Sequence, residues 1–185
     1  MHSLKTPIDD SIIKLLFTGD QVTITGKLYT ARDAAHKRLI ELIETEKPLP
    51  VDLKGQILYY TGPTPPKPGM AIGSAGPTTS SRMDRYTPKL ISASGLRGII
   101  GKGNRGPEVI EALRIFNCVY FAATGGAGAL LGKRIKKARV VCWEDLGPEA
   151  IYELVVEDFP AVVAIDVRGR NMYVEGPAEW RGYMR

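Results

Sequence analysis

The chain has 185 residues, of which 25 are Lys or Arg and 20 are Asp or Glu, so its formal net charge is +5. Hydrophobic residues make up 44% and charged residues 24%, which is ordinary for a soluble globular protein. No apolar run reaches membrane-spanning length, and the first residues do not resemble a signal peptide. We therefore expect one cytoplasmic domain over residues 1–185, with 1–10 as a loosely ordered tail.

Cysteine usage and charge narrow the function classes further. Cys118 and Cys142 are isolated in apolar, strand-like runs, so they form no C-x-x-C pair and cannot supply a metal site alone. Buried free thiols are the simplest interpretation. The positive charge is compatible with nucleic acid, but it fits an anionic small substrate or an acidic partner equally well.

In the first half of the chain, apolar periodicity and prolines predict the elements. Residues 6–17 form an apolar opening segment, and residues 22–29 alternate as a half-buried strand should. A helix is expected from 30 to about 46, where two prolines follow. Residues 56–60 form a second strand, and the proline-rich run 61–69 predicts a rigid loop. We expect the strands of this half to form a hairpin-like β-layer.

In the second half, apolar runs alternate with helical patterns, which predicts an α/β layer with partly parallel strands. Strands are expected at 98–104, 118–122, 139–143 and 161–167, and helical patterns at 83–90, 107–116 and 148–156. The basic run 133–137 predicts a solvated helix face, with a nucleic-acid contact as the alternative. The glycine-rich run 124–128 lacks phosphate-loop spacing, so close backbone packing explains it better.

The most informative stretch is a run of four hydroxyl residues, 78–81, that precedes the helical pattern at 83–90. Such residues cap helices, so backbone N–H groups and hydroxyls would point off one helix end. Arg82 would lie one turn inside that helix, where its guanidinium can reach back and bind a carboxylate or phosphate. An ordinary capped helix is the alternative explanation.

Two further places carry candidate functional side chains. Arg32 and His36 are four residues apart, so they share one face of the expected helix. Lys102 lies between Gly101 and Gly103, in a loop whose backbone can approach a ligand closely. A structural or surface histidine and a solvated loop lysine are the alternatives.

A resemblance to a known protein family extends over essentially the whole chain. It rests on four motifs in this order: TARDAAH at 30–36, YTGP at 60–63, GPTTSSRMD at 76–84 and GKG at 101–103. They resemble the class I iron–sulfur fumarate hydratase and L-tartrate dehydratase family, specifically its β subunit, which is equivalent to the C-terminal domain of single-chain fumarases. The resemblance implies a swivelling β/β/α domain, with mixed sheet layers and helices packed on one side. It also implies an α subunit whose three cysteines hold a catalytic [4Fe–4S] cluster, whereas this chain holds no metal.

The resemblance also assigns residues to roles. It places catalytic groups at Thr78 and His36, and substrate-binding groups at Arg32, Thr78, Thr79, Ser80, Ser81, Arg82 and Lys102. Removing a proton beside a carboxylate builds up charge on that carboxylate, so arginines, a lysine and helix-end N–H groups are suitable stabilisers. The open iron of the cluster would act as a Lewis acid on the departing hydroxyl. A carboxylate of the α subunit would take up the threonine proton.

We therefore expect the β subunit of an Fe–S-dependent hydro-lyase that interconverts fumarate and (S)-malate and is active only in a hetero-oligomer with its α subunit. The expected ligand is a small dicarboxylate, with no nucleic acid and no membrane. An L-tartrate dehydratase β subunit is the alternative within the family. A nucleic-acid-binding module is the alternative outside it, although the aromatic and basic surface pattern of the common RNA folds is missing.

Overall fold

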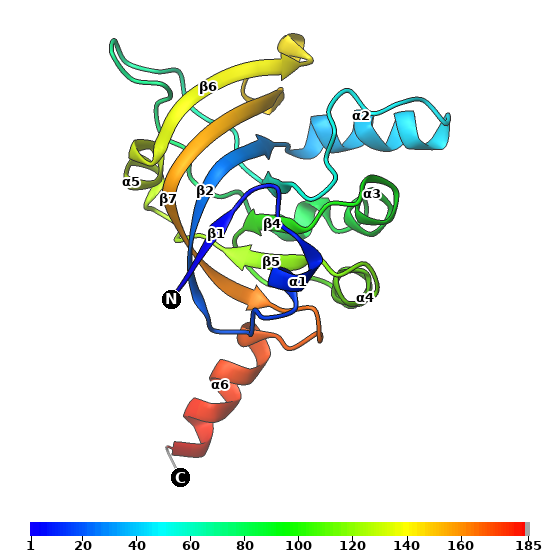
Figure 1. The fold of residues 1–185 in the computed structure, drawn as a ribbon, viewed down its shortest axis with the longest axis vertical. Coiled ribbons are helices and arrows are strands. Elements are labelled where there is room, and N and C mark those ends of the chain that lie inside the picture. Colours follow the sequence, from blue (N-terminus) through cyan, green and yellow to red (C-terminus); the bar gives the residue numbers. More distant parts are fainter. Residues whose placement is uncertain (184–185) are drawn as a thin grey trace.

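In the computed structural model, which describes residues 1–183, seven strands form one mixed sheet surrounded by helices (Figure 1). The strands are β1 (His2–Lys5), β2 (Gln21–Thr30), β3 (Ile57–Tyr59), β4 (Gly98–Gly101), β5 (Val119–Ala122), β6 (Ile135–Cys142) and β7 (Ile151–Ile165). The helices are α1 (Asp10–Ile13), α2 (Asp33–Glu44), α3 (Thr87–Ser94), α4 (Pro107–Ile115), α5 (Gly128–Lys133) and α6 (Met172–Tyr183), with 3₁₀ segments η1 (Ser80–Met83) and η2 (Glu144–Glu149). The expected α/β class is confirmed. No helix within residues 1–183 is both long enough and apolar enough to cross a bilayer.

The strand order is β1-β2-β3-β4-β5-β7-β6, and β7 also pairs with β2. Each neighbouring pair from β1 to β5 is parallel. In contrast, β7 runs antiparallel to β2, β5 and β6. Because β7 pairs with both β5 and β2, the strands β2, β3, β4, β5 and β7 close into a ring.

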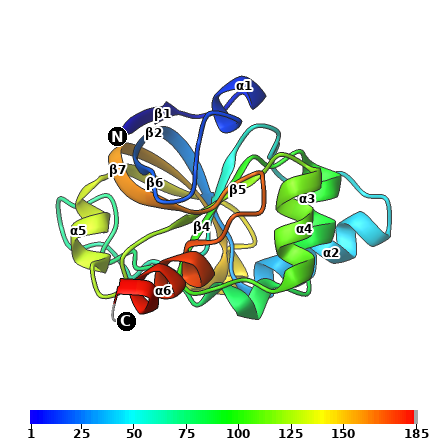
Figure 2. The same ribbon diagram turned by 90° about the horizontal axis from the view of Figure 1, so that it is seen from below.

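Helical crossovers connect the parallel strands, as parallel pairing requires. α2 joins β2 to β3, η1 and α3 lie between β3 and β4, and α4 joins β4 to β5. α2, α3 and α4 lie together on one side of the sheet, α5 lies on the opposite side, and α6 extends away from the body (Figure 1; Figure 2). Each crossover returns the chain to the same end of the sheet, so the carboxyl ends of β2, β3, β4 and β5 share one edge.

Buried apolar residues form a core on each face of the strands. Along β3, Ile57 and Tyr59 belong to one core and Leu58 belongs to the other, as the two-residue repeat of a strand requires. The first core includes Leu131 of α5, and the second includes Leu39 of α2. Packing on both faces therefore holds the strands from which the candidate residues extend.

The start of the chain differs from the expected loose tail and the expected hairpin layer. His2–Lys5 forms β1, pairs with β2 in parallel, and buries Leu4. β2 is paired in parallel with β3 as well, because α2 lies between them and returns the chain. The antiparallel partner of β2 is β7, more than a hundred residues later. Neither the loose tail nor the hairpin layer is present.

The expected helix at 148–156 is wrong, because residues 151–156 form the first part of β7. The expected strand at 161–167 is largely the second part of that same strand. Ile151, Tyr152, Val155 and Val156 are β-branched or aromatic, which favours a strand. Here β7 pairs with β2 and β6 at once, so ladder hydrogen bonds on both edges outweigh the weak helical pattern.

Two shorter elements also differ from expectation. The run 133–137 is not one helix face, because α5 ends at Lys133 and β6 begins at Ile135. Lys136 on β6 pairs with Glu157, its ammonium 3.4 Å from the carboxylate. The pattern at 83–90 is split between η1 and α3, because α3 begins only at Thr87. The other expected strands and helices are confirmed, with shifted ends.

Candidate functional site

The predicted residues follow strands that end at one edge of the sheet. Arg32 lies two residues after β2, and Gly62 lies three residues after β3. Lys102 directly follows β4, and Thr124 lies two residues after β5. In α/β proteins, both open sheets and closed barrels bind ligands at the carboxyl ends of their parallel strands. We therefore take this edge as the candidate site.

Close contacts show that these segments meet. A Cβ at Gly62 would lie 2.7 Å from Nη1 of Arg32, so the loop after β3 passes directly against that guanidinium. A Cβ at Gly125 would lie 3.6 Å from Cδ of Lys102. Thr79 and Lys102 form an isolated parallel bridge. The structure thus brings the hydroxyl run beside the lysine loop.

Arg32 and Arg82 lie around a single carboxylate oxygen. Nη2 of Arg82 is 2.7 Å from Oδ2 of Asp33, and Nη2 of Arg32 is 3.9 Å from the same oxygen. Arg32 also lies 3.6 Å from Oε1 of Glu149, while its buried Nε has no hydrogen-bond partner within residues 1–183. Two guanidinium groups from distant segments therefore converge at a place that already accommodates a carboxylate oxygen. In the structure this place is taken by the carboxylate of Asp33 itself.

The hydroxyl run does not cap a helix in the expected way. Thr79 is the N-cap of η1, and its side chain makes no capping hydrogen bond. Thr78 donates its backbone N–H to the carbonyl of Tyr60 at 2.7 Å. The hydroxyls of Thr78, Thr79 and Ser81 make no hydrogen bond to any part of residues 1–183. These three hydroxyls are consequently available to a ligand, and the helix-capping explanation for them is wrong.

Ser80 differs from its neighbours because it is fully buried. Its Oγ accepts the backbone N–H of Lys102 at 3.2 Å, and its own N–H donates to the carbonyl of Lys102 at 3.0 Å. The side chain of Lys102 is half-buried and makes no ion pair with any residue from 1 to 183. The backbone of this lysine is thus held firmly while its ammonium group stays free.

Sequence reasoning missed a buried ion pair beneath this loop. The side chain of Arg105 is 0% exposed, and its Nε donates to Oδ1 of Asp84 at 2.7 Å. Its Nη2 donates to Thr87 at 2.8 Å, and its guanidinium lies over the rings of Tyr60 and Tyr120. Asp84 belongs to the GPTTSSRMD motif, which was the one available signal. The sequence next to Arg105 gave no signal, because all the partners of its side chain lie 15 or more residues away along the chain.

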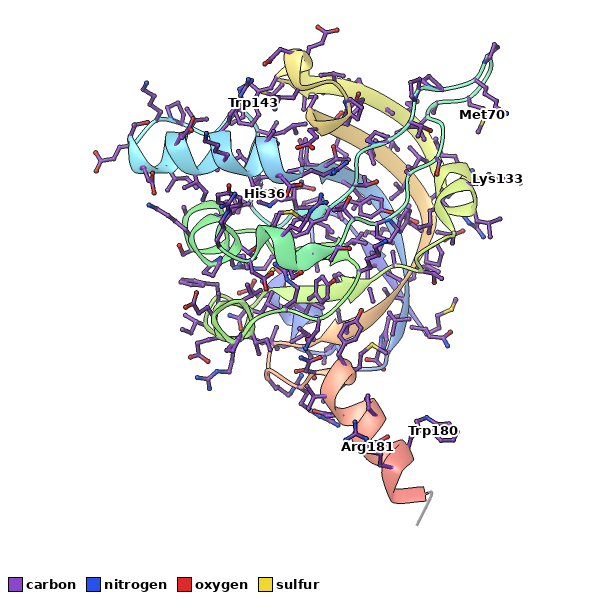
Figure 3. All side chains as sticks on the ribbon, turned by 180° about the vertical axis from the view of Figure 1, so that it is seen from behind. His36, Met70, Lys133, Trp143, Trp180 and Arg181 are labelled. Carbon is purple, nitrogen blue, oxygen red and sulfur yellow. The ribbon has the colours of Figure 1, made fainter. Side chains whose placement is uncertain are left out.

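His36 is fully buried between α2 and α3, and its label in Figure 3 marks this place. Its Nδ1 lies 2.9 Å from the carbonyl oxygen of Arg32, which can only accept, so Nδ1 carries the proton. Its ring packs edge-on against Tyr60 and stacks on Tyr86. Burial lowers the pKa of His36 to about 4, so the ring is neutral at pH 7. His36 is thus hydrogen-bonded to the backbone carbonyl of Arg32. The catalytic role of His36 stays a prediction.

Residues 1–183 do not offer a set of ligands that fits a metal or an iron–sulfur cluster. Within residues 1–183, no three His, Cys, Asp or Glu side chains are grouped so that they could hold a metal ion. Cys118 is buried just before β5, where burial raises the pKa of its thiol to about 12. Cys142 ends β6 and is partly buried. A thiol that stays protonated is a poor ligand, since metals bind the thiolate.

Comparison with known proteins identifies related chains. The family described as Fumarase C-terminus matches residues 3–176. A Methanocaldococcus jannaschii chain with the provisional name L(+)-tartrate dehydratase subunit beta is 39% identical over 168 residues, which is 88% of this chain and 86% of that one. Fumarate hydratase 2 of Leishmania major is 38% identical over 173 residues, which is 92% of this chain but 30% of that protein. L(+)-tartrate dehydratase subunit beta of Escherichia coli is 35% identical over 176 residues, 93% of this chain and 86% of the relative.

Proposed function

This chain belongs to the Fumarase C-terminus family, and from that premise we propose that it is the substrate-binding β subunit of a hydro-lyase acting on a small dicarboxylate. The active complex would contain an α subunit that binds a [4Fe–4S] cluster and would lie in the cytoplasm. The names of the relatives, which include a dehydratase β subunit and a fumarate hydratase, support both the reaction class and the need for a second chain. The lack of a cluster-binding group in residues 1–183 is consistent with this division of labour.

The observation that carries this proposal is the convergence of Arg32 and Arg82 on one oxygen of Asp33. Dehydration of a 2-hydroxydicarboxylate removes a proton from the carbon next to one carboxylate and releases the hydroxyl from the neighbouring carbon. Negative charge then accumulates on the carboxylate beside the carbon that loses its proton. Arg32, Arg82 and Lys102 supply the cations that stabilise this charge. The cluster, when bound, supplies a Lewis acid for the departing hydroxyl.

Thr78 is the residue of this chain that we assign to proton transfer. Its backbone is held by Tyr60, and its half-buried hydroxyl remains free at the candidate site. Threonine is a weak base by itself, so a carboxylate of the α subunit would take up the proton. Thr79 and Ser81 lie exposed on either side of Ser80 and would contact the substrate carboxylate.

Fumarate and (S)-malate are the substrates we favour, chiefly because the alanines around Arg32 resemble those of fumarase β chains. Tartrate is the second candidate, and the two relatives with tartrate dehydratase names favour it. The two substrates differ by one hydroxyl. The chain is 39% and 35% identical to the two tartrate dehydratase subunits and 38% identical to the fumarate hydratase, so sequence identity favours neither substrate.

The test is co-expression of this chain with a candidate α chain that contains three well-spaced cysteines, followed by anaerobic purification. We expect a brown, oxygen-sensitive complex that hydrates fumarate, or that dehydrates L-tartrate if the second candidate is right. Activity on both substrates is measured in the same preparation, so the ratio of kcat/KM values decides between them. Co-purified RNA and no dicarboxylate activity would instead favour the nucleic-acid-binding alternative.

A further inference from the structure

Four groups connect the lysine loop to the hydroxyl run through consecutive hydrogen bonds. The backbone N–H of Lys102 donates to Oγ of Ser80 at 3.2 Å. Oη of Tyr120 lies 3.0 Å from that same Oγ and 2.9 Å from the carbonyl oxygen of Gly103. The connection thus leaves the backbone at residue 102, passes through two side-chain hydroxyls and returns to the backbone at residue 103. We call it the hydroxyl ring.

The backbone groups of Lys102 and Gly103, at the two ends of the hydroxyl ring, determine the directions of the hydrogen bonds that they make. An N–H can only donate, so Oγ of Ser80 accepts from Lys102. A carbonyl can only accept, so the Tyr120 hydroxyl donates its proton to Gly103. The remaining proton, on Ser80, has two acceptors within reach, the oxygen of Tyr120 at 3.0 Å and the carbonyl oxygen of Thr78 at 3.5 Å. Each donor in the ring therefore has an acceptor, which suits the fully buried side chains of Ser80 and Tyr120.

The surroundings make the ring rigid. The guanidinium of Arg105 lies over the ring of Tyr120 with 5.0 Å between its Cζ and the ring centroid. A Cβ at Gly101 would collide with the Ser80 hydroxyl and would lie 3.2 Å from Oη of Tyr120. This close approach explains why the first glycine of the GKG motif has no side chain. The tyrosine cannot move away without losing packing on both sides.

We propose that Ser80 and Tyr120 are positioning residues of the substrate site, which act by holding the backbone of Lys102 so that its ammonium group faces the dicarboxylate. Both residues are fully buried with their hydroxyls engaged, so neither touches the substrate itself. This assigns Ser80 a different role from the exposed Thr79 and Ser81, although all three belong to one motif. Tyr120 lies outside every motif that the sequence singled out. The role rests on the proposed function, because it presumes that Lys102 binds the substrate.

The first test is independent of activity and uses amide hydrogen exchange on the purified chain. Ser80→Ala and Tyr120→Phe should each accelerate exchange in the segment 101–104 by roughly tenfold, because each removes a hydroxyl that takes part in two hydrogen bonds of the ring. The matched control is Tyr29→Phe, which removes another buried tyrosine hydroxyl whose partner is Glu153, far along the chain from both segments. That control should leave exchange at 101–104 unchanged. Unaltered exchange in both ring variants would overturn the proposal.

The second test uses the same variants in the complete complex with its α chain. Because Lys102 already binds the carboxylate before the proton is removed, a less well positioned Lys102 should weaken substrate binding. Ser80→Ala and Tyr120→Phe should therefore raise KM for the dicarboxylate roughly fivefold to tenfold and leave kcat within about threefold. Faster exchange with an unchanged KM would show that the ring does not position a substrate group. If the wild-type complex acts on no dicarboxylate, the proposed function fails instead, and the exchange result still decides whether the ring holds Lys102. Should Tyr120→Phe fail to fold, Ser80→Ala, which removes only one oxygen, decides the outcome.

Discussion

Thr78 enters the candidate site with its backbone fixed and its hydroxyl free of hydrogen bonds to residues 1–183. If it transfers a proton, Thr78→Ser should keep much of the activity and Thr78→Ala should lose nearly all of kcat. KM should change little in the alanine variant, because carboxylate binding depends on Arg32, Arg82 and Lys102. The measurement is kcat and KM of both variants in the anaerobic complex. An alanine variant with near-normal kcat would end the catalytic assignment.

The two arginines around Asp33 should contribute to substrate binding in the transition state. Arg32→Ala and Arg82→Ala should each lower kcat/KM by at least roughly a hundredfold, because each removes charge-assisted contacts to a carboxylate. Steady-state kinetics of the complex provides the measurement. Arg114→Ala is the control, since Arg114 is an exposed arginine on α4 that pairs with Glu111. Values within threefold of wild type for Arg32→Ala or Arg82→Ala would show that the arginine is structural.

At the scale of elements, one ion pair joins the segment between η1 and α3 to the loop before α4. Asp84 accepts from Nε of Arg105 and also from the backbone N–H of Gly106, both at 2.7 Å. Asp84→Asn would leave the buried cation of Arg105 without its counter-charge and should lower the free energy of unfolding by about 3 kcal/mol. Arg105→Met should cost less, because Asp84 is 22% exposed and can reach water.

Chemical denaturation of both variants at pH 7 tests whether Asp84→Asn lowers the free energy of unfolding more than Arg105→Met does. Glu111→Ala, which breaks an exposed pair, serves as the control and should change stability little. An Asp84→Asn variant as stable as wild type would mean that the pair is not needed to join the two segments.

α2 packs against α3 around His36, and this packing predicts a pH-dependent stability. Burial lowers the pKa of His36 from 6.5 to about 4, so the unfolded chain takes up a proton at a higher pH than the folded chain does. The neutral, buried ring of His36 therefore contributes on the order of 3 kcal/mol to the free energy of unfolding. This contribution is complete above pH 6.5 and is lost as the pH falls towards 4. His36→Asn keeps a donor for the Arg32 carbonyl but removes this titration.

Free energies of unfolding measured between pH 4 and pH 7 should therefore fall less steeply for His36→Asn than for wild type. His2→Asn, which alters an exposed histidine beside Asp20, should follow the wild-type curve. Parallel curves for wild type and His36→Asn would show that the buried ring does not titrate in this range.

At the scale of the whole molecule, the closed ring of strands and its two cores lead us to expect that the chain folds without a partner. The proposed chemistry, however, needs a bound iron–sulfur cluster, and residues 1–183 contain no group of side chains that could hold a metal ion. We predict that the purified chain shows a cooperative unfolding transition but no hydratase or dehydratase activity. Circular dichroism melting and an assay with fumarate, (S)-malate and L-tartrate provide the measurements. Turnover by the metal-free chain alone would refute the division of labour between two subunits.

Several features could be predicted from the sequence because their signals are local. β2 and α2 follow from apolar repeats of period two and 3.6, and prolines mark the end of the helical pattern. The order and separation of four short motifs predicted the family, which the comparison confirmed. The glycines around Lys102 predicted a close approach by a ligand, which stays a prediction, whereas at Gly101 the structure shows that Ser80 fills the space.

Other features were decided only by the tertiary structure, because they depend on partners far along the chain. Residues 151–156 became a strand because β2 and β6 pair with both of its edges. Ser80 became buried, unlike Thr79 and Ser81, because Lys102 and Tyr120 close over its hydroxyl. Hydrogen-bond ladders and buried polar groups gain their free energy from such distant contacts, and no local pattern of apolar and polar residues records them.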